Sequence, residues 1–330
     1  MTVPKLEGGS SLTQFTLAER IKKRFNKGFT LYEHALINSL KREKVDGVLA
    51  EYGPTACQNL DVVKFLKLPL VVHFFGYDAS LISVLKNYAD QYKKLFSYVD
   101  AVVVVSKKMK NDLLALGCPS DKLVISICGP DPDFFKLKPS YDKQQFIAVG
   151  RFVEKKAPYL TLLAFKKVVY IYPKAKLIMV GDGHLLVMCK NLVKALNFEN
   201  NIEFRGVLTP EEIQLLYMDS LAFVQHSIIA ESGDSEGTPV AILDAQASAL
   251  PVLSTYHAGI PDVIINNETG LLVDEYDVDG MAKNMIRILK EKELAQKLGM
   301  AGRERIRNNF TMEKHLDTLQ NLIEKAMTKE

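Results

Sequence analysis

The chain has 330 residues, about twice the size of a usual domain, which predicts two domains of about 150 residues each. Apolar residues make up 48% and charged residues 25%, a globular composition that excludes intrinsic disorder as the main state. The net charge of +3 gives no argument for a nucleic-acid partner. No run approaches the ~18 apolar residues of a membrane span, and the first residues lack an apolar signal core, so we expect a cytoplasmic protein.

Charge is distributed unevenly along the chain. Residues 1–140 hold 20 Lys and Arg against 14 Asp and Glu, whereas the remainder holds 22 against 25. A basic first half is compatible with an anionic membrane surface, which would make the protein peripheral on the inner face of a membrane. A solvated, lysine-rich helix face explains the same excess, and both interpretations stay open.

The four cysteines are scattered, without a CxxC pair or a histidine cluster nearby in the sequence: Cys57, Cys118, Cys128 and Cys189. This pattern argues against a zinc site or a disulfide framework, and it is typical of a reducing compartment.

Short β-branched runs alternate with amphipathic segments along the whole chain. In the first half we predict helices over Leu12–Phe25, Thr30–Lys44, Leu81–Leu95 and Lys107–Leu116. The predicted strands are Gly47–Glu51, Pro69–Phe74, Ala101–Ser106 and Leu123–Ile127. Strands of this length separated by crossover helices predict a parallel, doubly wound sheet.

The second half repeats the alternation after a segment dense in proline and charge, residues 129–139. Predicted strands are Gln145–Val149, Lys176–Val180, Ile202–Phe204, Leu221–Gln225, Pro251–Ser254 and Gly270–Val273. Predicted helices are Pro158–Tyr170, His184–Leu196, Pro210–Met218 and Pro239–Ala249, with charged helices from Val278 onward. The chain thus divides into an N-terminal Rossmann-like domain (1–138), a second Rossmann-like domain (139–310) and a C-terminal helix (311–330) that packs back toward the first domain. Ligands of parallel sheets bind at the carboxyl ends of the strands, so we expect the site in the cleft between the halves.

Two cations follow the first strand of the second half. Arg151 and Lys156 lie on the loop between this strand and the helix that begins at Pro158. Such a loop can receive a phosphate, and a planar guanidinium with a mobile ammonium suits a diphosphate. Two unrelated surface cations remain the alternative.

Acidic residues mark a second loop, which runs into Gly237-Thr238-Pro239 and a helix. Backbone N–H groups of Gly237 and Thr238 are expected to point into the cleft. Asp244 follows Glu236 by eight residues, so the two carboxylates are expected on nearly one helix face, about 10 Å apart, where they suit a sugar hydroxyl and a ribose diol. A helix cap for Glu236 and a solvated face for Asp244 are the alternatives.

His73 and Asp78 flank a glycine just past a predicted strand, which would let a ligand approach the backbone. A structural histidine and a helix-capping aspartate explain them as well. The turn Gly181–Gly183 is not a dinucleotide fingerprint, because Leu186 stands where a glycine is required; this argues against a nicotinamide oxidoreductase.

These motifs occur together in one known family. From Gln144 to about Phe310 the chain carries a Gly-Arg…Lys loop, a Gly-Asp-Gly turn, a spaced acidic pair and two further segments, at 150–157, 181–183, 236–244, 248–255 and 257–262. Together they resemble the retaining glycosyltransferases of family 4, which have the α/β GT-B fold of two facing Rossmann-like domains. Residues 51–56 and 73–78 are similar to members that build polysaccharides.

The resemblance implies transfer of a hexose from a nucleotide diphosphate sugar, UDP-sugar favoured over GDP-sugar, to a glycan or lipid-linked acceptor. Arg151 and Lys156 would hold the diphosphate in place of a metal, so no divalent ion or cofactor is expected. Glu236 would contact the donor sugar and Asp244 the ribose. The substrate-binding set would be completed by residues around these two and by the base site: Gly237, Thr238, Pro239, His73, Asp78, Gly206 and Val207.

Several positions depart from the family pattern. Asp244 is one methylene shorter than the usual Glu, Ala157 and Ala249 replace glycines, and Phe75 stands where many relatives have histidine. Only 46 residues precede the first predicted strand, so the resemblance implies a shortened N-terminal domain. These departures keep open a catalytically weak sugar-nucleotide-binding or scaffold protein of the same fold; another GT-B enzyme such as an epimerase is a further alternative.

Overall fold

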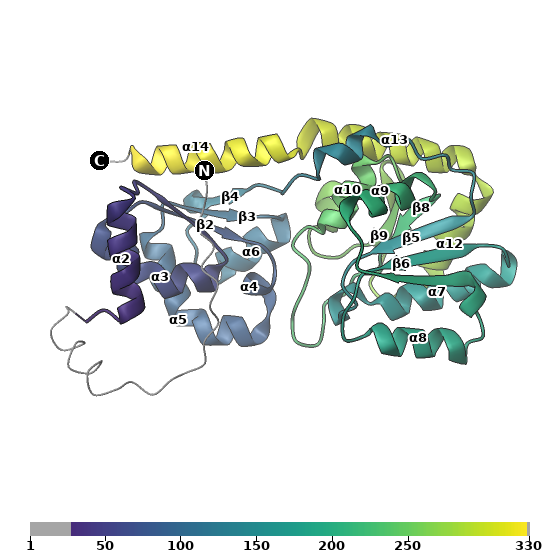
Figure 1. The fold of residues 1–330 in the computed structure, drawn as a ribbon, viewed down its shortest axis with the longest axis horizontal. Coiled ribbons are helices and arrows are strands. Elements are labelled where there is room, and N and C mark those ends of the chain that lie inside the picture. The colour runs from purple at the N-terminus through teal and green to yellow at the C-terminus, as the bar shows by residue number, and fades with distance from the viewer. Residues whose placement is uncertain (1–27, 329–330) are drawn as a thin grey trace.

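Strands and helices alternate along residues 28–328, the part of the chain that the computed structural model describes (Figure 1). The predicted helix Leu12–Phe25 lies outside these residues. All ten predicted strands are present, with ends within two residues of those expected. No helix of the described part is long and apolar enough to cross a bilayer.

The first domain is built on four parallel strands in the order β1-β2-β3-β4. They are β1 (Val48–Glu51), β2 (Leu70–Phe74), β3 (Ala101–Val104) and β4 (Leu123–Ile125). Every residue of β2 and β3 is buried, as expected of parallel strands covered on both faces, and this explains their nearly continuous apolar sequence.

The helices of the first domain are α2 (Leu31–Arg42), α3 (Gly53–Leu66), α4 (Tyr77–Ser80), α5 (Ile82–Tyr98) and α6 (Lys107–Ala115). Capping residues determine where several of these helices begin. Thr30 and Glu33 form a capping box at α2, and the Ser106 hydroxyl accepts a hydrogen bond from the Met109 N–H at α6. The helix α3 was not among those predicted.

The second domain has six parallel strands in the order β10-β9-β8-β5-β6-β7. They are β5 (Gln145–Val149), β6 (Lys176–Val180), β7 (Ile202–Gly206), β8 (Ala222–Val224), β9 (Val252–Thr255) and β10 (Gly270–Val273). The direction of the order reverses between β5 and β8, so the carboxyl ends of these two strands form a topological switch point.

Apolar side chains cover both faces of this sheet. Along β5 and β6, Phe146 and Leu177 join one buried cluster, whereas their neighbours Ile147 and Ile178 join another. This alternation is the two-residue period of a strand. The covering helices are α7 (Pro158–Ile171), α8 (Leu186–Ala195), α9 (Pro210–Met218), α10 (Val240–Ala247), α11 (Ile260–Val263), α12 (Val278–Lys290) and α13 (Lys292–Asn309).

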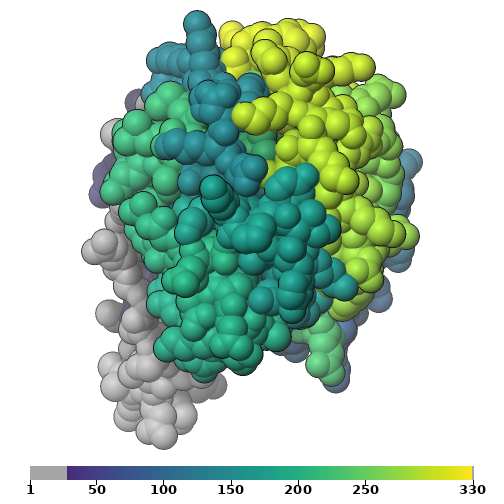
Figure 2. All heavy atoms as spheres, turned by 90° about the vertical axis from the view of Figure 1, so that its right-hand side faces the viewer, coloured from purple at the N-terminus to yellow at the C-terminus, as the bar shows by residue number. Residues whose placement is uncertain are grey.

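The last helix returns to the first domain. Figure 2 shows the C-terminal helices, in yellow, along one side of the second domain, and in Figure 1 α14 (Met312–Met327) continues from α13 across the first. Leu319 and Ala326 of α14 pack on Val71 of β2 and Val103 of β3. Burial of this apolar face holds the end of the chain on the first sheet.

Candidate active site

The candidate site lies at the switch point of the second sheet. Two loops leave the sheet there: residues 150–157 after β5, and residues 225–239 after β8. The first contains the short 3-10 helix Glu154–Lys156, and the second is irregular over its whole length. Ligands of open α/β sheets bind at this place because loops from adjacent strands diverge there.

A buried ion pair joins the two loops. Lys156 Nζ lies 3.0 Å from Glu236 Oε1, and their side chains are only 14% and 8% exposed. Lys156 also donates a hydrogen bond to Gln225 Oε1, at 3.3 Å. Burial acts to raise the pKa of Glu236, but the charges of Lys156 and Lys155 outweigh it and hold the pKa below its usual value. Glu236 is therefore an ionised carboxylate at neutral pH.

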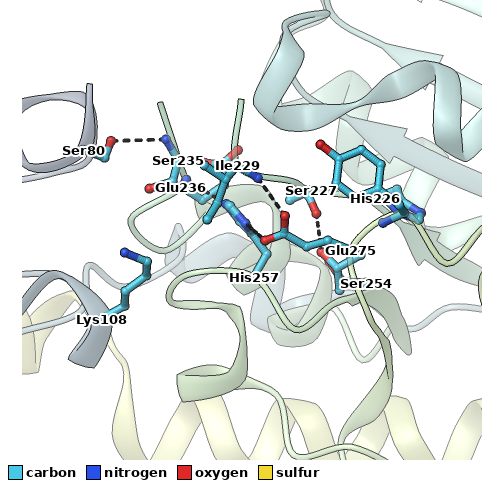
Figure 3. Close-up of polar contacts among 12 residues, drawn as sticks. Ser80, Lys108, His226, Ser227, Ile229, Ser235, Glu236, Ser254, His257 and Glu275 are labelled. Carbon is cyan, nitrogen blue, oxygen red and sulfur yellow. Dashed lines mark hydrogen bonds and ion pairs between the residues drawn. The ribbon is translucent and has the colours of Figure 1, made fainter. Parts of the chain in front are cut away.

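A histidine side chain holds the backbone of Glu236 in place. Its N–H donates to His257 Nε2 at 3.0 Å, and His257 Nδ1 lies 2.6 Å from Glu275 Oε1 (Figure 3). Nε2 must accept, so Nδ1 carries the proton and donates to Glu275. Burial lowers the pKa of His257, against the raising effect of Glu275, so the ring is neutral and its tautomer is fixed.

The Glu236 loop meets the first domain directly. A Cβ on Gly237 would lie 2.1 Å from the Phe75 carbonyl oxygen, so only glycine fits there. The Thr238 hydroxyl donates to the Val105 carbonyl at 2.6 Å. Gly237 and Thr238 thus connect the two domains at this point, and Pro239 beside them is buried. That their backbone N–H groups face the cleft stays a prediction.

The expectation that Glu236 and Asp244 share one helix face is wrong. The helix α10 begins only at Val240, because Pro239 is extended and the residues before it are held by His257 and the first domain. Glu236 thus points to Lys156, whereas Asp244 lines a separate cavity and accepts the Asp131 N–H at 3.2 Å.

Two cavities extend along the carboxyl ends of the strands. One, of about 550 Å³, is lined by Gly150, Arg151, Gly181, Asp182, Gly183, Val207, Leu208 and Ile213 with the ends of β5 and β6. The other, of about 600 Å³, contains Asp131, Tyr217, Val240 and Asp244. They share Val149 and Ile213, so they are neighbouring parts of one groove. Each is large enough for part of a nucleotide.

Of the predicted phosphate and base residues, Arg151 and Val207 lie on the first of these cavities. Arg151 is exposed and has no ion-pair partner among the described residues, so its guanidinium is available to a ligand. Val207 is 78% exposed on the same cavity, directly after Gly206. The glycines of the Gly181–Gly183 turn are required for packing, since a Cβ on Gly181 would lie 2.1 Å from the Gly150 carbonyl oxygen.

Burial raises the pKa of Asp244 to about 7, although the hydrogen bond from Asp131 opposes the shift. The folded state therefore keeps this proton to a higher pH than the unfolded chain does. Between about pH 4 and pH 7, Asp244 is ionised in the unfolded chain but protonated in the folded protein. It therefore lowers the free energy of unfolding over that window, and it continues to do so above pH 7.

We expect Asp244→Asn to raise the free energy of unfolding by up to about 4 kcal/mol at pH 8 and by little at pH 4. Urea unfolding between these pH values measures the difference. The same substitution at the exposed Asp121 is the control. If the gain in unfolding free energy from Asp244→Asn did not grow with pH, Asp244 would not be a buried carboxylate that ionises in this range.

His73 and Asp78 are both buried, and neither lines the groove described above. Their expected role in substrate binding stays a prediction. The Asp78 carboxylate is fully buried and accepts hydrogen bonds from the N–H groups of Gly53, Phe75 and Gly76. It therefore fixes the loop after β2. His73 points into the interior beside His315, and burial together with that neighbour lowers its pKa to about 3.

A histidine–cysteine cluster exists in space, although the four cysteines are scattered along the sequence. His73, Cys128 and His315 each offer one ligand atom, and these atoms lie within 4.8 Å of one another. The sequence does not reveal the cluster because the three residues come from β2, the linker after β4 and α14. All four cysteines are free.

Sequence reasoning also missed the residues that support Glu236. His257 lies in the segment 257–262 but was given no role, and Glu275, Gln225 and Lys155 were not predicted to belong to the site. Lys155 is buried and pairs with Asp234 at 3.0 Å, which anchors the same loop. The sequence signal for these residues was weak, because each acts through a contact between distant loops.

The chain is similar to several known proteins. Residues 131–305 match the family model described as Glycosyl transferases group 1. The amylovoran biosynthesis glycosyltransferase AmsK of Erwinia amylovora is 27% identical over 78% of this chain and 64% of its own length. WcaL of Escherichia coli strain K12, named for colanic acid biosynthesis, is 27% identical over 82% of this chain and 68% of its own. The chain thus spans about two thirds of these relatives.

A solved structure shows the same fold. The Anabaena protein Alr3699/HepE, crystallised with UDP, superposes with a TM-score of 0.76 at 13% identity, over 89% of this chain and 82% of its own. At this identity the likeness concerns the fold alone, and it confirms the predicted GT-B fold class.

Proposed function

Because the chain belongs to the group 1 glycosyltransferases, we propose that it moves a hexose from a nucleoside diphosphate sugar to a glycan or lipid-linked acceptor. We place this reaction in polysaccharide biosynthesis, to which the names of AmsK and WcaL refer. The observation that carries the proposal is the Lys156–Glu236 ion pair at the switch point, next to the groove that Arg151 lines.

The donor occupies the groove in an extended arrangement in this proposal. The base stacks beside Val207, the ribose hydroxyls reach the Asp244 carboxylate, and the diphosphate lies between these and the Lys156 ammonium. UDP is favoured over GDP, in line with the HepE crystals. The sugar then lies next to Glu236, on the side of the first domain, where the acceptor enters.

Catalysis in this proposal depends on charged side chains that the fold holds in position before the reaction begins. Arg151 and Lys156 stabilise the negative charge that develops on the leaving diphosphate, a role that needs no metal ion. Glu236 stabilises the positive charge that develops at the reacting carbon of the sugar. The acceptor attacks from the face that the diphosphate leaves, and a phosphate oxygen takes its proton, so the configuration is retained.

Isothermal titration of the chain with UDP and GDP, without metal and then with Mg²⁺, tests the donor half of the proposal. We expect micromolar binding of UDP in both conditions. Binding that requires Mg²⁺ would refute the metal-independent mechanism, and failure to bind either nucleotide would favour the non-catalytic scaffold protein. Transfer assays with labelled UDP-hexoses and glycan acceptors then test the reaction.

Arg151→Ala should weaken UDP binding by about 10- to 100-fold, because it removes a charge-assisted contact to phosphate. Its free energy of unfolding should change by less than about 0.5 kcal/mol, since the side chain is exposed and makes no ion pair within the described residues. Arg287→Ala, an exposed arginine on α12, is the matched control. If the two variants bound UDP with equal affinity, Arg151 would not contact the diphosphate.

A further inference from the structure

His73, Cys128 and His315 meet beneath α14, outside the Lys156–Glu236 pair. Only 1% of His73 is exposed, and neither of its ring nitrogens has a hydrogen-bond partner among the described residues. A buried imidazole without a partner costs free energy, so it indicates a ligand that the protein chain itself does not supply. The Cys128 thiol and a nitrogen of His315 lie within 4.8 Å of one of its nitrogens.

We propose that His73, Cys128 and His315 bind one zinc-like divalent cation, which fastens the C-terminal helix to the first domain. Two imidazole nitrogens and one thiolate form a borderline-soft donor set, which Zn²⁺ prefers over Mg²⁺ or Ca²⁺. Ligand atoms of a tetrahedral zinc ion lie about 3.5 Å apart. The three atoms here, within 4.8 Å of one another, reach that spacing by side-chain shifts of about an ångström.

The surroundings of His315 fit a metal ligand. Its Nδ1 lies 2.8 Å from the Ser126 hydroxyl, which leaves Nε2 facing Cys128 Sγ at 3.8 Å. Metal-binding histidines are usually oriented in this way, by a hydrogen bond at the second ring nitrogen. Ser126 is thus a positioning residue for the ligand nitrogen.

The same geometry indicates how a cation reaches the cluster and which segments it would connect. Cys128 and Met312 line the cavity of about 600 Å³, so a cation can enter from it and a water molecule can fill the fourth coordination position. Cys128 belongs to the linker between the domains, and His315 lies 187 residues later on α14. A shared cation would therefore crosslink β2, the linker and the last helix.

Cobalt titration of the chelator-treated full chain tests the proposal, because a thiolate-bound Co²⁺ gives a sulfur-to-metal charge-transfer band. We expect this band with one Co²⁺ per chain, its displacement by Zn²⁺, and a higher Tm with Zn²⁺. Cys128→Ser should abolish the band and weaken Zn²⁺ binding at least tenfold. Cys118→Ser, a buried cysteine outside the cluster, should change neither. Ser126→Ala should keep the band and weaken binding by about 10- to 100-fold.

Absence of the band in the wild-type chain, or a band that survives Cys128→Ser, would overturn the proposal. His73→Asn provides an independent check if Cys128→Ser folds poorly, since unchanged Zn²⁺ affinity in that variant would also overturn it. These readouts are separate from nucleotide binding and sugar transfer, so the two proposals can fail independently.

Discussion

Glu236→Gln should lower kcat for sugar transfer by about 100-fold or more and leave UDP affinity within about threefold. The carboxylate is ionised, buried and held by its own backbone N–H on His257, so it is a fixed negative charge beside the proposed position of the sugar. Glutamine keeps the shape and removes the charge. Steady-state kinetics with the donor sugar, together with UDP titration, separates the two effects.

Glu231→Gln is the matched control, because this exposed glutamate lies on the same loop and undergoes the same substitution. It should retain wild-type kinetics. If Glu236→Gln transferred sugar at the wild-type rate, Glu236 would serve only to hold Lys156. If it lost UDP binding as well, the carboxylate would act on the nucleotide part of the donor.

Lys156→Met should have two distinct effects. It leaves the Glu236 carboxylate buried without its main counter-charge, which should lower the free energy of unfolding by about 3–5 kcal/mol. It also removes the ammonium from the proposed diphosphate site, so UDP binding should weaken by about 10-fold or more. Urea unfolding measures the first effect and titration the second.

The double variant Lys156→Met/Glu236→Gln separates these effects. Removing both charges should restore much of the stability, because no uncompensated charge remains buried. UDP affinity should stay as low as in Lys156→Met. If the double variant bound UDP like the wild type, the loss in Lys156→Met would come from the misplaced Glu236 and not from a lost phosphate contact.

Ala157 and Ala249, the two departures from glycine, both have left-handed backbone conformations in the structure, with φ of 36° and 61°. The family pattern has glycine at both positions, and a left-handed conformation favours glycine. A tight turn can thus be identified from the residue type that it normally requires, even when that residue has been replaced.

The sequence by itself determined the strands, the parallel sheets and the loop that carries Arg151 and Lys156. These features depend on patterns within about ten residues, namely the apolar period, the turn residues and the proline at a helix start. Chain order and short crossovers then restrict which strands can pair. The strand order, and with it the switch point that positions the site, came from the structure.

Only the tertiary structure decided where the acidic side chains point and which distant residues meet. Glu236 was assigned to a helix face by its spacing from Asp244, but an irregular loop has no period from which a direction can be extrapolated. Its direction is set by His257 and the first domain. The contacts of His73 with Cys128 and His315 span the linker and the return of α14, and they arise from packing between segments whose sequences contain no local signal for one another.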